Sequence, residues 1–349
     1  MMMPTDDLRI LALHELSSPA AVIGEIPRSS RAASCVSGAR QAIHRILTGA
    51  DDRLLVVIGP CSVHDPDAAL EYAQRLSGLR GRFDGELEIV MRVYFEKPRT
   101  TIGWKGLIND PSHDGTFDID RGLRVARQLL RAIGNIGVPA GCEFLDTSTP
   151  QYIADLVSWA AIGARTTESQ VHREMASGLS CPVGFKNGTE GNVQIAVDAV
   201  VSASQPHHFM AITKGARSAI ATTADNPECH IILRGGKAPN YDAASVAAAS
   251  LVAARAGRRP AIMIDASHGN SGKNADNQPL VVADVSRQIE SGERRIIGMM
   301  VESNLLPGRQ DLIPGAPLVY GLSITDACIG WEASVDVLER LARAVKRRR

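Results

Sequence analysis

Residues 54–61 read Leu-Leu-Val-Val-Ile-Gly-Pro-Cys, an unbroken apolar run that ends at a cysteine. Two later runs have the same form: 261–265 precedes His268, and 296–301 ends at Glu302. Continuous apolar runs of this length are typical of strands that are buried on both faces of a parallel sheet. A thiol, an imidazole and a carboxylate therefore follow three predicted strands. In barrels of parallel strands, catalytic groups collect at the carboxyl ends of the strands.

The chain contains eight candidate strands of this kind: 54–60, 86–95, 139–144, 158–163, 182–186, 230–234, 260–265 and 296–302. Helical patterns lie between most of them. Strands that alternate with helices indicate an α/β fold with a parallel sheet. Eight such units favour a closed sheet, so we expect a (β/α)8 TIM barrel rather than an open doubly wound sheet.

Two segments lie outside the eight-unit pattern, and we expect both to be additions to a single barrel domain that spans 1–349. Residues 1–45 predict an N-terminal extension, which is an arm followed by a helix. Residues 206–224 alternate with period two around Lys214-Gly215, which predicts an inserted hairpin. Additions of this kind usually serve oligomer contacts or regulation, so we expect a regulatory hairpin.

The composition narrows the class of protein. In 349 residues, 38 Lys and Arg balance 38 Asp and Glu, which argues against a nucleic-acid or anionic-membrane partner. No apolar run approaches the ~20 residues that span a bilayer, and the first residues show no signal-peptide pattern. We therefore expect a cytoplasmic protein. The 6 cysteines form no CxxC pair, so disulfides are not expected.

Four side chains form a candidate metal site: Cys61, His268, Glu302 and Asp326. A thiolate and an imidazole beside carboxylates suit a divalent transition ion better than magnesium or calcium. Their spacing matches no zinc-finger pattern, and the site is supported by the position that three of them share after predicted strands. A buried structural thiol at Cys61 and a core histidine at His268 are the alternatives.

Cations form a second group near the predicted strand ends. Four of them lie in or just after strand runs: Arg92, Arg165, Lys186 and Arg234. The segment Lys97-Pro98-Arg99-Thr100 adds two cations and a hydroxyl after the second run. Because cations are rarely buried without partners, this set predicts an anionic ligand, such as a phosphorylated and carboxylated substrate. The alternative is a set of salt bridges to three carboxylates: Glu143, Asp146 and Glu168.

These residues belong to longer motifs that resemble those of one enzyme family. Three of the motifs are Gly59-Pro60-Cys61-Ser62-Val63-His64-Asp65, Gly163-Ala164-Arg165-Thr166-Thr167-Glu168-Ser169 and Asp265-Ala266-Ser267-His268. In their order and spacing they resemble the class I 3-deoxy-D-arabino-heptulosonate-7-phosphate (DAHP) synthases, in the microbial feedback-regulated subgroup. The resemblance extends from about Asp6 to the C-terminal helix.

The resemblance implies a transferase that condenses phosphoenolpyruvate with erythrose 4-phosphate to DAHP and phosphate. This is the first step of the shikimate pathway of aromatic amino acid biosynthesis. The implied ligands of a divalent metal ion (Mn, Fe or Co, with Zn as a further candidate) are Cys61, His268, Glu302 and Asp326. The implied phosphoenolpyruvate site comprises Arg92, Gly163, Ala164, Arg165, Lys186 and Arg234. The aldose phosphate would contact Lys97, Arg99 and Thr100, and Lys97 would also donate a proton or orient water.

The resemblance further implies feedback inhibition by an aromatic amino acid, with phenylalanine or tyrosine slightly favoured over tryptophan. It also implies that the protein is a homodimer or a homotetramer. The implied effector pocket joins the hairpin to the arm of a neighbouring subunit and includes Asp6, Asp7, Gln151, Leu179, Ser180 and Phe209.

Two other hypotheses compete with the synthase. A class II aldolase-like barrel would use a histidine-rich site with fewer cations. A non-enzymatic effector sensor would not need the intact set of Cys61, His268, Glu302 and Asp326.

Overall fold

Eight parallel strands close into a barrel in the computed structural model, which describes residues 3, 5–99, 101–313 and 315–349. The order around the barrel is β1-β10-β9-β8-β5-β4-β3-β2. The strands are β1 (Leu54–Gly59), β2 (Leu87–Arg92), β3 (Ala140–Glu143), β4 (Trp159–Ile162), β5 (Val183–Lys186), β8 (Cys229–Leu233), β9 (Ile262–Asp265) and β10 (Ile296–Glu302). Each strand overlaps one predicted apolar run, and the predicted (β/α)8 TIM barrel is confirmed.

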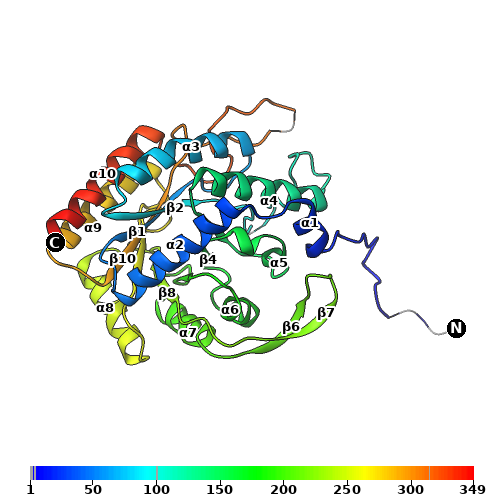
Figure 1. Ribbon diagram of the computed structural model, residues 1–349, viewed down its shortest axis with the longest axis horizontal. Coiled ribbons are helices and arrows are strands. Elements are labelled where there is room, and N and C mark those ends of the chain that lie inside the picture. The colour runs from blue at the N-terminus through cyan, green and yellow to red at the C-terminus, as the bar shows by residue number, and fades with distance from the viewer. Residues whose placement is uncertain (1–2, 4, 100, 314) are drawn as a thin grey trace.

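Helices surround the barrel and cover its outer face (Figure 1). They are α3 (Pro66–Arg82), α4 (Ile119–Ile136), α5 (Thr149–Ile153), α6 (Gln170–Ser177), α7 (Gln194–Ala203), α8 (Ala243–Arg255), α9 (Gln278–Glu290) and α10 (Trp331–Arg348). The helix α4 illustrates why they form. Leu123, Ala126, Leu130 and Ile133 recur at helical spacing and are buried against the sheet. The side chain of Asp118 caps the first turn, and Gly137 ends the helix in the left-handed conformation.

Two short 3-10 turns, Ala154–Leu156 and Ala275–Asn277, adjoin α5 and α9. Two further helices, α1 (Pro19–Glu25) and α2 (Ser30–Thr48), precede the barrel. The side chains of Ile43 and Ile46 in α2 belong to the same buried cluster as the barrel-interior residues Val57 and Trp159. The helix α2 therefore closes the amino-terminal end of the barrel, and the opposite end, where the strands finish, is left for a site.

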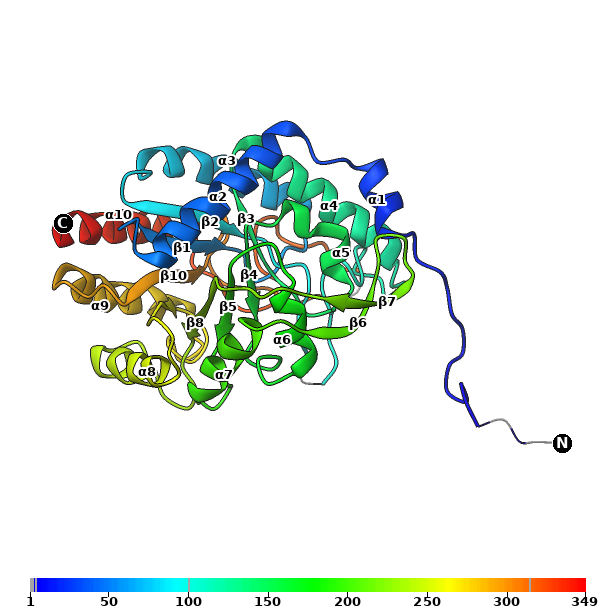
Figure 2. The ribbon, with the colours of Figure 1, turned by 60° about the horizontal axis from the view of Figure 1, so that its bottom comes forward.

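The strands β6 (His208–Ile212) and β7 (Ser218–Thr222) form a separate antiparallel pair between β5 and β8. This hairpin lies on the side of α5 and α6, and its tip reaches α1 (Figure 2). At the tip, Ala20 N–H donates to Lys214 O at 2.7 Å, and Lys214 Nζ donates to Gln151 O. The N-terminal arm extends away from the body of the molecule and exposes apolar side chains such as Leu8 and Leu13 (Figure 2).

One glycine brings β1 close to β2 at the carboxyl end of the barrel. Gly59 has φ +152, and a Cβ atom there would lie 2.8 Å from the carbonyl oxygen of Arg92. A larger residue at 59 would therefore push Arg92 away from the strand ends.

Among the described residues, no helix is both long enough and apolar enough to span a membrane.

Candidate active site

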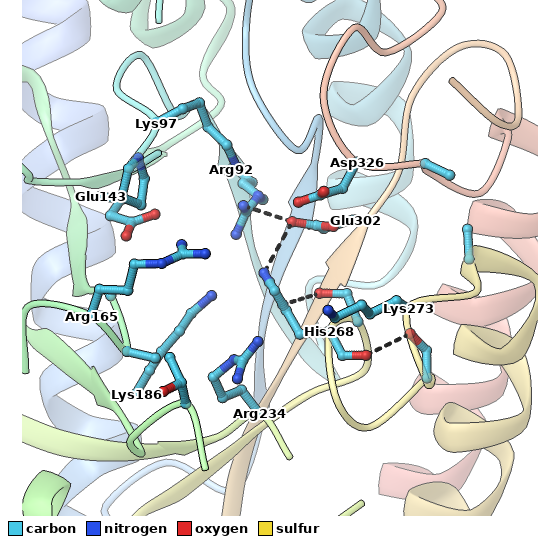
Figure 3. Close-up of a pocket in the computed structure, with 18 of the residues that line it drawn as sticks. Arg92, Lys97, Glu143, Arg165, Lys186, Arg234, His268, Lys273, Glu302 and Asp326 are labelled. Atoms are coloured by element: carbon cyan, nitrogen blue, oxygen red, sulfur yellow. Dashed lines mark hydrogen bonds and ion pairs between the residues drawn. The ribbon is translucent and has the colours of Figure 1, made fainter. Parts of the chain in front are cut away.

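The four residues predicted to bind a metal lie together at the carboxyl ends of β1, β9 and β10. Cys61 follows β1, Glu302 ends β10, and one ligand atom from each of Cys61, Glu302 and Asp326 lies within 4.8 Å of the other two. The Cys61 sulfur is 3.3 Å from Asp326 Oδ2. His268 Nε2 is 3.9 Å from Glu302 Oε1, and Figure 3 shows His268, Glu302 and Asp326 on one side of the cavity.

The electrostatics of this cluster suit a cation. Burial and the neighbouring Glu302 raise the pKa of Cys61 to about 11, although the Lys97 ammonium, 3.0 Å from the sulfur, opposes the shift. Burial also acts to raise the pKa of Asp326, but Lys97 and His268 outweigh it, so the pKa lies below its ordinary value. A divalent ion would favour the thiolate, because a coordinating thiol loses its proton. One sulfur, one imidazole nitrogen and two carboxylates fit a first-row transition ion.

A cavity of about 350 Å³ opens beside this cluster. Its described lining includes eight cationic residues: Arg92, Lys97, Arg99, Arg165, Lys186, Arg234, Lys273 and Arg309. Among the described residues of the lining, three are acidic: Glu143, Glu302 and Asp326. Arg92, Arg165, Lys186 and Arg234 point into a common space opposite His268 (Figure 3). This excess of positive charge suits a ligand that carries several negative charges.

The predicted anion-binding residues gather here as well. Gly163 and Ala164 line the cavity next to Arg165, and Arg99 lines it next to Lys97. Thr100, the remaining predicted contact of the aldose phosphate, lies outside the described residues.

Two of the cations are fixed by carboxylates at the strand ends. The fully buried Arg92 donates from Nη2 to Glu302 Oε1 at 2.9 Å, and its guanidinium lies 3.6 Å from the centre of the Tyr94 ring. Lys186 Nζ lies 3.0 Å from Asp265 Oδ2. Burial opposes ionisation of Asp265, but Lys186 and His268 hold the pKa of that carboxyl well below its ordinary range. These partners, Glu302 and Asp265, differ from the three carboxylates that the salt-bridge alternative named.

Three further residues lie at the site that the sequence did not single out. Lys273 and Arg309 line the cavity from loops after β9 and β10, and no pattern in the sequence singles them out. The loop after β9 is unusual, because His268 and Lys273 both have positive φ, 57 and 62, and Lys273 N–H donates to His268 O at 2.8 Å. Asp265 is the last residue of β9, and a carboxylate that ends an apolar run was the signal that could have found it.

The residues implied for an effector pocket do not all come together within one chain. Phe209 in β6 lines a second cavity, of about 470 Å³, between the hairpin and α6. Gln151, Leu179 and Ser180 are not part of its lining. Asp6 and Asp7 lie in the exposed arm, which points away from the body of the molecule (Figure 2).

Comparisons with known proteins agree with this geometry. The model of the DAHP synthetase I family matches residues 28–339. The chain is 60% identical over 344 residues to "Phospho-2-dehydro-3-deoxyheptonate aldolase, Phe-sensitive" of Escherichia coli (strain K12), an alignment that covers 99% of this chain and 98% of that protein. It is 55% identical over 344 residues to "Phospho-2-dehydro-3-deoxyheptonate aldolase, Trp-sensitive" of Enterobacter agglomerans, an alignment that covers 99% of this chain and 99% of that protein.

A solved structure is also similar over almost the whole chain. The phospho-2-dehydro-3-deoxyheptonate aldolase from Francisella tularensis SCHU S4 matches with a TM-score of 0.96 and 49% sequence identity, covering 98% of this chain and 100% of that chain. The sequence motifs, the barrel and these matches agree: the chain belongs to the DAHP synthetase I family.

Proposed function

We propose that this protein condenses phosphoenolpyruvate with erythrose 4-phosphate to give DAHP and phosphate, and that an aromatic amino acid inhibits it. The observation that carries the proposal is the cavity in which eight cationic residues lie beside a cluster of Cys61, Glu302 and Asp326, with His268 Nε2 3.9 Å from Glu302. Phosphoenolpyruvate carries a carboxylate and a phosphate, and the aldose carries a second phosphate, so the substrates match the charge of the cavity. The names of relatives that are 60% and 55% identical support the same activity.

In this proposal, four cations bind phosphoenolpyruvate at the ends of β2, β4, β5 and β8: Arg92, Arg165, Lys186 and Arg234. Fixed cations hold the carboxylate and phosphate, and they orient the substrate so that its C3 carbon faces the aldehyde. Lys97 and Arg99 hold the phosphate of the aldose on the β2 side. The backbone of Gly163 and Ala164 completes the phosphoenolpyruvate site.

Lys97 is the candidate proton donor to the new alkoxide oxygen. Burial disfavours its charge, but Cys61 and Glu302 outweigh burial and hold the pKa of Lys97 above its ordinary value, so the ammonium form is present at neutral pH. An ammonium group can donate the proton directly or stabilise the alkoxide charge. Water adds at C2 of the former phosphoenolpyruvate, and phosphate leaves by C–O cleavage.

The proposed holders of the metal ion are Cys61, His268, Glu302 and Asp326, and Mn, Fe or Co suits this mixed set of donors. When bound, a divalent ion supplies Lewis-acid polarisation of the aldehyde oxygen. Arg92 positions Glu302 through the 2.9 Å hydrogen bond between them.

We propose phenylalanine as the effector, because the relative that is 60% identical is named Phe-sensitive. The hairpin and the arm of a neighbouring subunit would form the pocket, and the protein would be a dimer or a tetramer. The exposed apolar side chains of the arm support this arrangement, because a second subunit would cover them.

The function can be tested by following phosphoenolpyruvate consumption and phosphate release in the purified protein, with Mn present. We expect both only when erythrose 4-phosphate is added, and we expect phenylalanine to inhibit more strongly than tyrosine or tryptophan. Cleavage of a sugar phosphate without phosphate release would instead indicate an aldolase. A protein that consumes neither substrate would contradict the proposal.

A further inference from the structure

The carboxylate of Asp265 lies between the candidate metal cluster and the candidate phosphoenolpyruvate site. It ends β9 and is fully buried. Its Oδ2 atom lies 2.9 Å from His268 Nδ1 and 3.0 Å from Lys186 Nζ. Its Oδ1 atom accepts hydrogen bonds from the backbone N–H of Ser267, at 2.9 Å, and from the Ser267 hydroxyl, at 2.5 Å. One buried group therefore contacts a candidate metal ligand and a candidate substrate cation at the same time.

These contacts favour one of the two neutral tautomers of His268. The Ser267 hydroxyl donates its only hydrogen to Asp265, so it can only accept from His268 Nδ1, 2.7 Å away. Asp265 Oδ2 lies 2.9 Å from the same nitrogen, in the geometry of an ion pair rather than of an aligned hydrogen bond, and a carboxylate oxygen can also only accept. Two acceptors around Nδ1 favour the Nδ1–H form and leave the Nε2 lone pair directed towards Glu302, 3.9 Å away.

The same carboxylate holds Lys186. This lysine ends β5 and has only 3% of its surface exposed, so its ammonium group needs a nearby anion when no substrate is present. Asp265 supplies that anion from β9, which β8 separates from β5 in the barrel, and fixes the ammonium at the edge of the cavity.

We infer that Asp265 is a positioning residue that presents the His268 Nε2 lone pair to a metal ion and holds Lys186 in place for an anionic substrate. This inference rests on the proposed function. Buried carboxylates commonly orient metal-binding histidines in this way, and their loss typically lowers metal affinity about 10–100-fold. The additional step here is that one carboxylate also anchors a substrate cation.

The test variant is Asp265→Asn, which keeps the size and removes the charge. The backbone N–H and the hydroxyl of Ser267 would keep donating to the side-chain oxygen of the new asparagine. Its NH2 group would therefore take the place of Oδ2 and face His268 and Lys186. His268 Nδ1 could then accept a hydrogen bond only as the Nε2–H form, which cannot bind a metal. We expect Mn affinity to fall about 10–100-fold, measured by titration of free Mn. We also expect nitrogen NMR of labelled histidine to show the change of tautomer in the metal-free protein.

The contact with Lys186 predicts a second effect, on the binding of phosphoenolpyruvate to the metal-free protein. Loss of a negative charge alone would tighten the binding of an anion, whereas a displaced ammonium group would weaken it. We expect about tenfold weaker binding by calorimetry, the size of a weakened charged hydrogen bond. Tighter or unchanged binding would overturn the positioning of Lys186.

Double-mutant cycles separate positioning from general damage. In a His268→Ala background, Asp265→Asn should cause little further loss of Mn affinity. In a Lys186→Ala background, it should cause little further loss of phosphoenolpyruvate affinity. Additive losses in both backgrounds would overturn the inference.

Asp155→Asn is a matched control, because the Asp155 carboxylate forms an ion pair with the buried Arg127, 2.6 Å away, and neither residue lines the cavity. It should lower thermal stability without changing the affinity for either ligand.

If Asp265→Asn does not fold, the tautomer of His268 in the unaltered protein still decides the question, and an Nε2–H signal would contradict the inference. The proposed function fails separately, if the unaltered protein binds neither Mn nor phosphoenolpyruvate. Normal binding of both ligands by Asp265→Asn would refute only the inference.

Discussion

Arg234 shows how a single residue can report on the substrate that the cavity binds. It follows β8 and points into the cavity (Figure 3). A hydrogen bond to a charged group contributes about 1.5–3 kcal/mol, so Arg234→Ala should weaken phosphoenolpyruvate binding roughly ten- to a hundredfold. Titration with phosphoenolpyruvate alone measures this change. Lys237→Ala is the control, because Lys237 is exposed and pairs with Glu190 outside the cavity. A larger effect on erythrose 4-phosphate than on phosphoenolpyruvate would reverse the assignment.

Glu96, which precedes Lys97, predicts a pH dependence of stability. Its buried carboxyl group accepts from Asp146 N–H at 3.1 Å and from the Thr149 hydroxyl at 3.3 Å, and burial raises its pKa to about 8 against these bonds. Between pH 4.5 and pH 8 the folded protein therefore retains a proton that the unfolded chain has lost. The free energy of unfolding should fall as the pH rises through this window, by at most about 1.4 kcal/mol per pH unit from this group.

The variant Glu96→Gln isolates this contribution, since an amide does not titrate. Denaturant unfolding between pH 5 and 8, compared with the unaltered protein, should show a flatter dependence on pH for the variant. Equal slopes for the two proteins would mean that Glu96 is ionised in the folded state throughout the range.

At the level of elements, the sequence was sufficient for the barrel strands but not for the effector pocket. All six residues of β1 and all seven of β10 are buried, so each strand left an uninterrupted apolar run. Parallel strands end at one face, which made the convergence of Cys61, His268 and Glu302 predictable. Their distances, and the contact of Asp265 with Lys186 from β5, depend on the register of neighbouring strands, which no single run encodes.

The arm and the hairpin make a separate prediction about regulation. In the part of the chain that the structure describes, the arm is exposed and β6 and β7 pair with each other rather than with a barrel strand, so neither segment is part of the barrel sheet. Deleting residues 1–12 should leave turnover nearly unchanged and relieve inhibition by phenylalanine, because the proposed effector pocket needs the arm of a neighbouring subunit. Coupling between such sites is typically about 1–3 kcal/mol, or a 5- to 150-fold change in effector affinity. Inhibition that persists unchanged in the truncated protein would contradict the proposed pocket.

In the whole molecule, the metal cluster connects parts of the chain that are far apart in sequence. Cys61 and Asp326, whose side chains are 3.3 Å apart, are separated by 265 residues, and the cluster includes groups that follow β1, β9 and β10. The carboxylates of Glu302 and Asp326 lie within 4.8 Å of each other and of the Cys61 sulfur, so a bound cation would offset the repulsion between their negative charges. A cation that binds only the folded state should therefore stabilise the entire barrel.

Mass action sets the size of this effect, which is about 2.7 kcal/mol when the free ion is at 100 times its Kd. We expect chelation to abolish activity and lower Tm, and Mn, Fe or Co to restore both.

Cys61→Ala should fold to a barrel with the same circular dichroism spectrum, because a residue at the rim contributes little to the core. Added metal should no longer raise the Tm of this variant. The unaltered protein and Cys61→Ala are compared because a nonspecific effect of the ion would raise the Tm of both proteins equally. Full activity in protein shown by elemental analysis to contain no metal would exclude a metal role altogether.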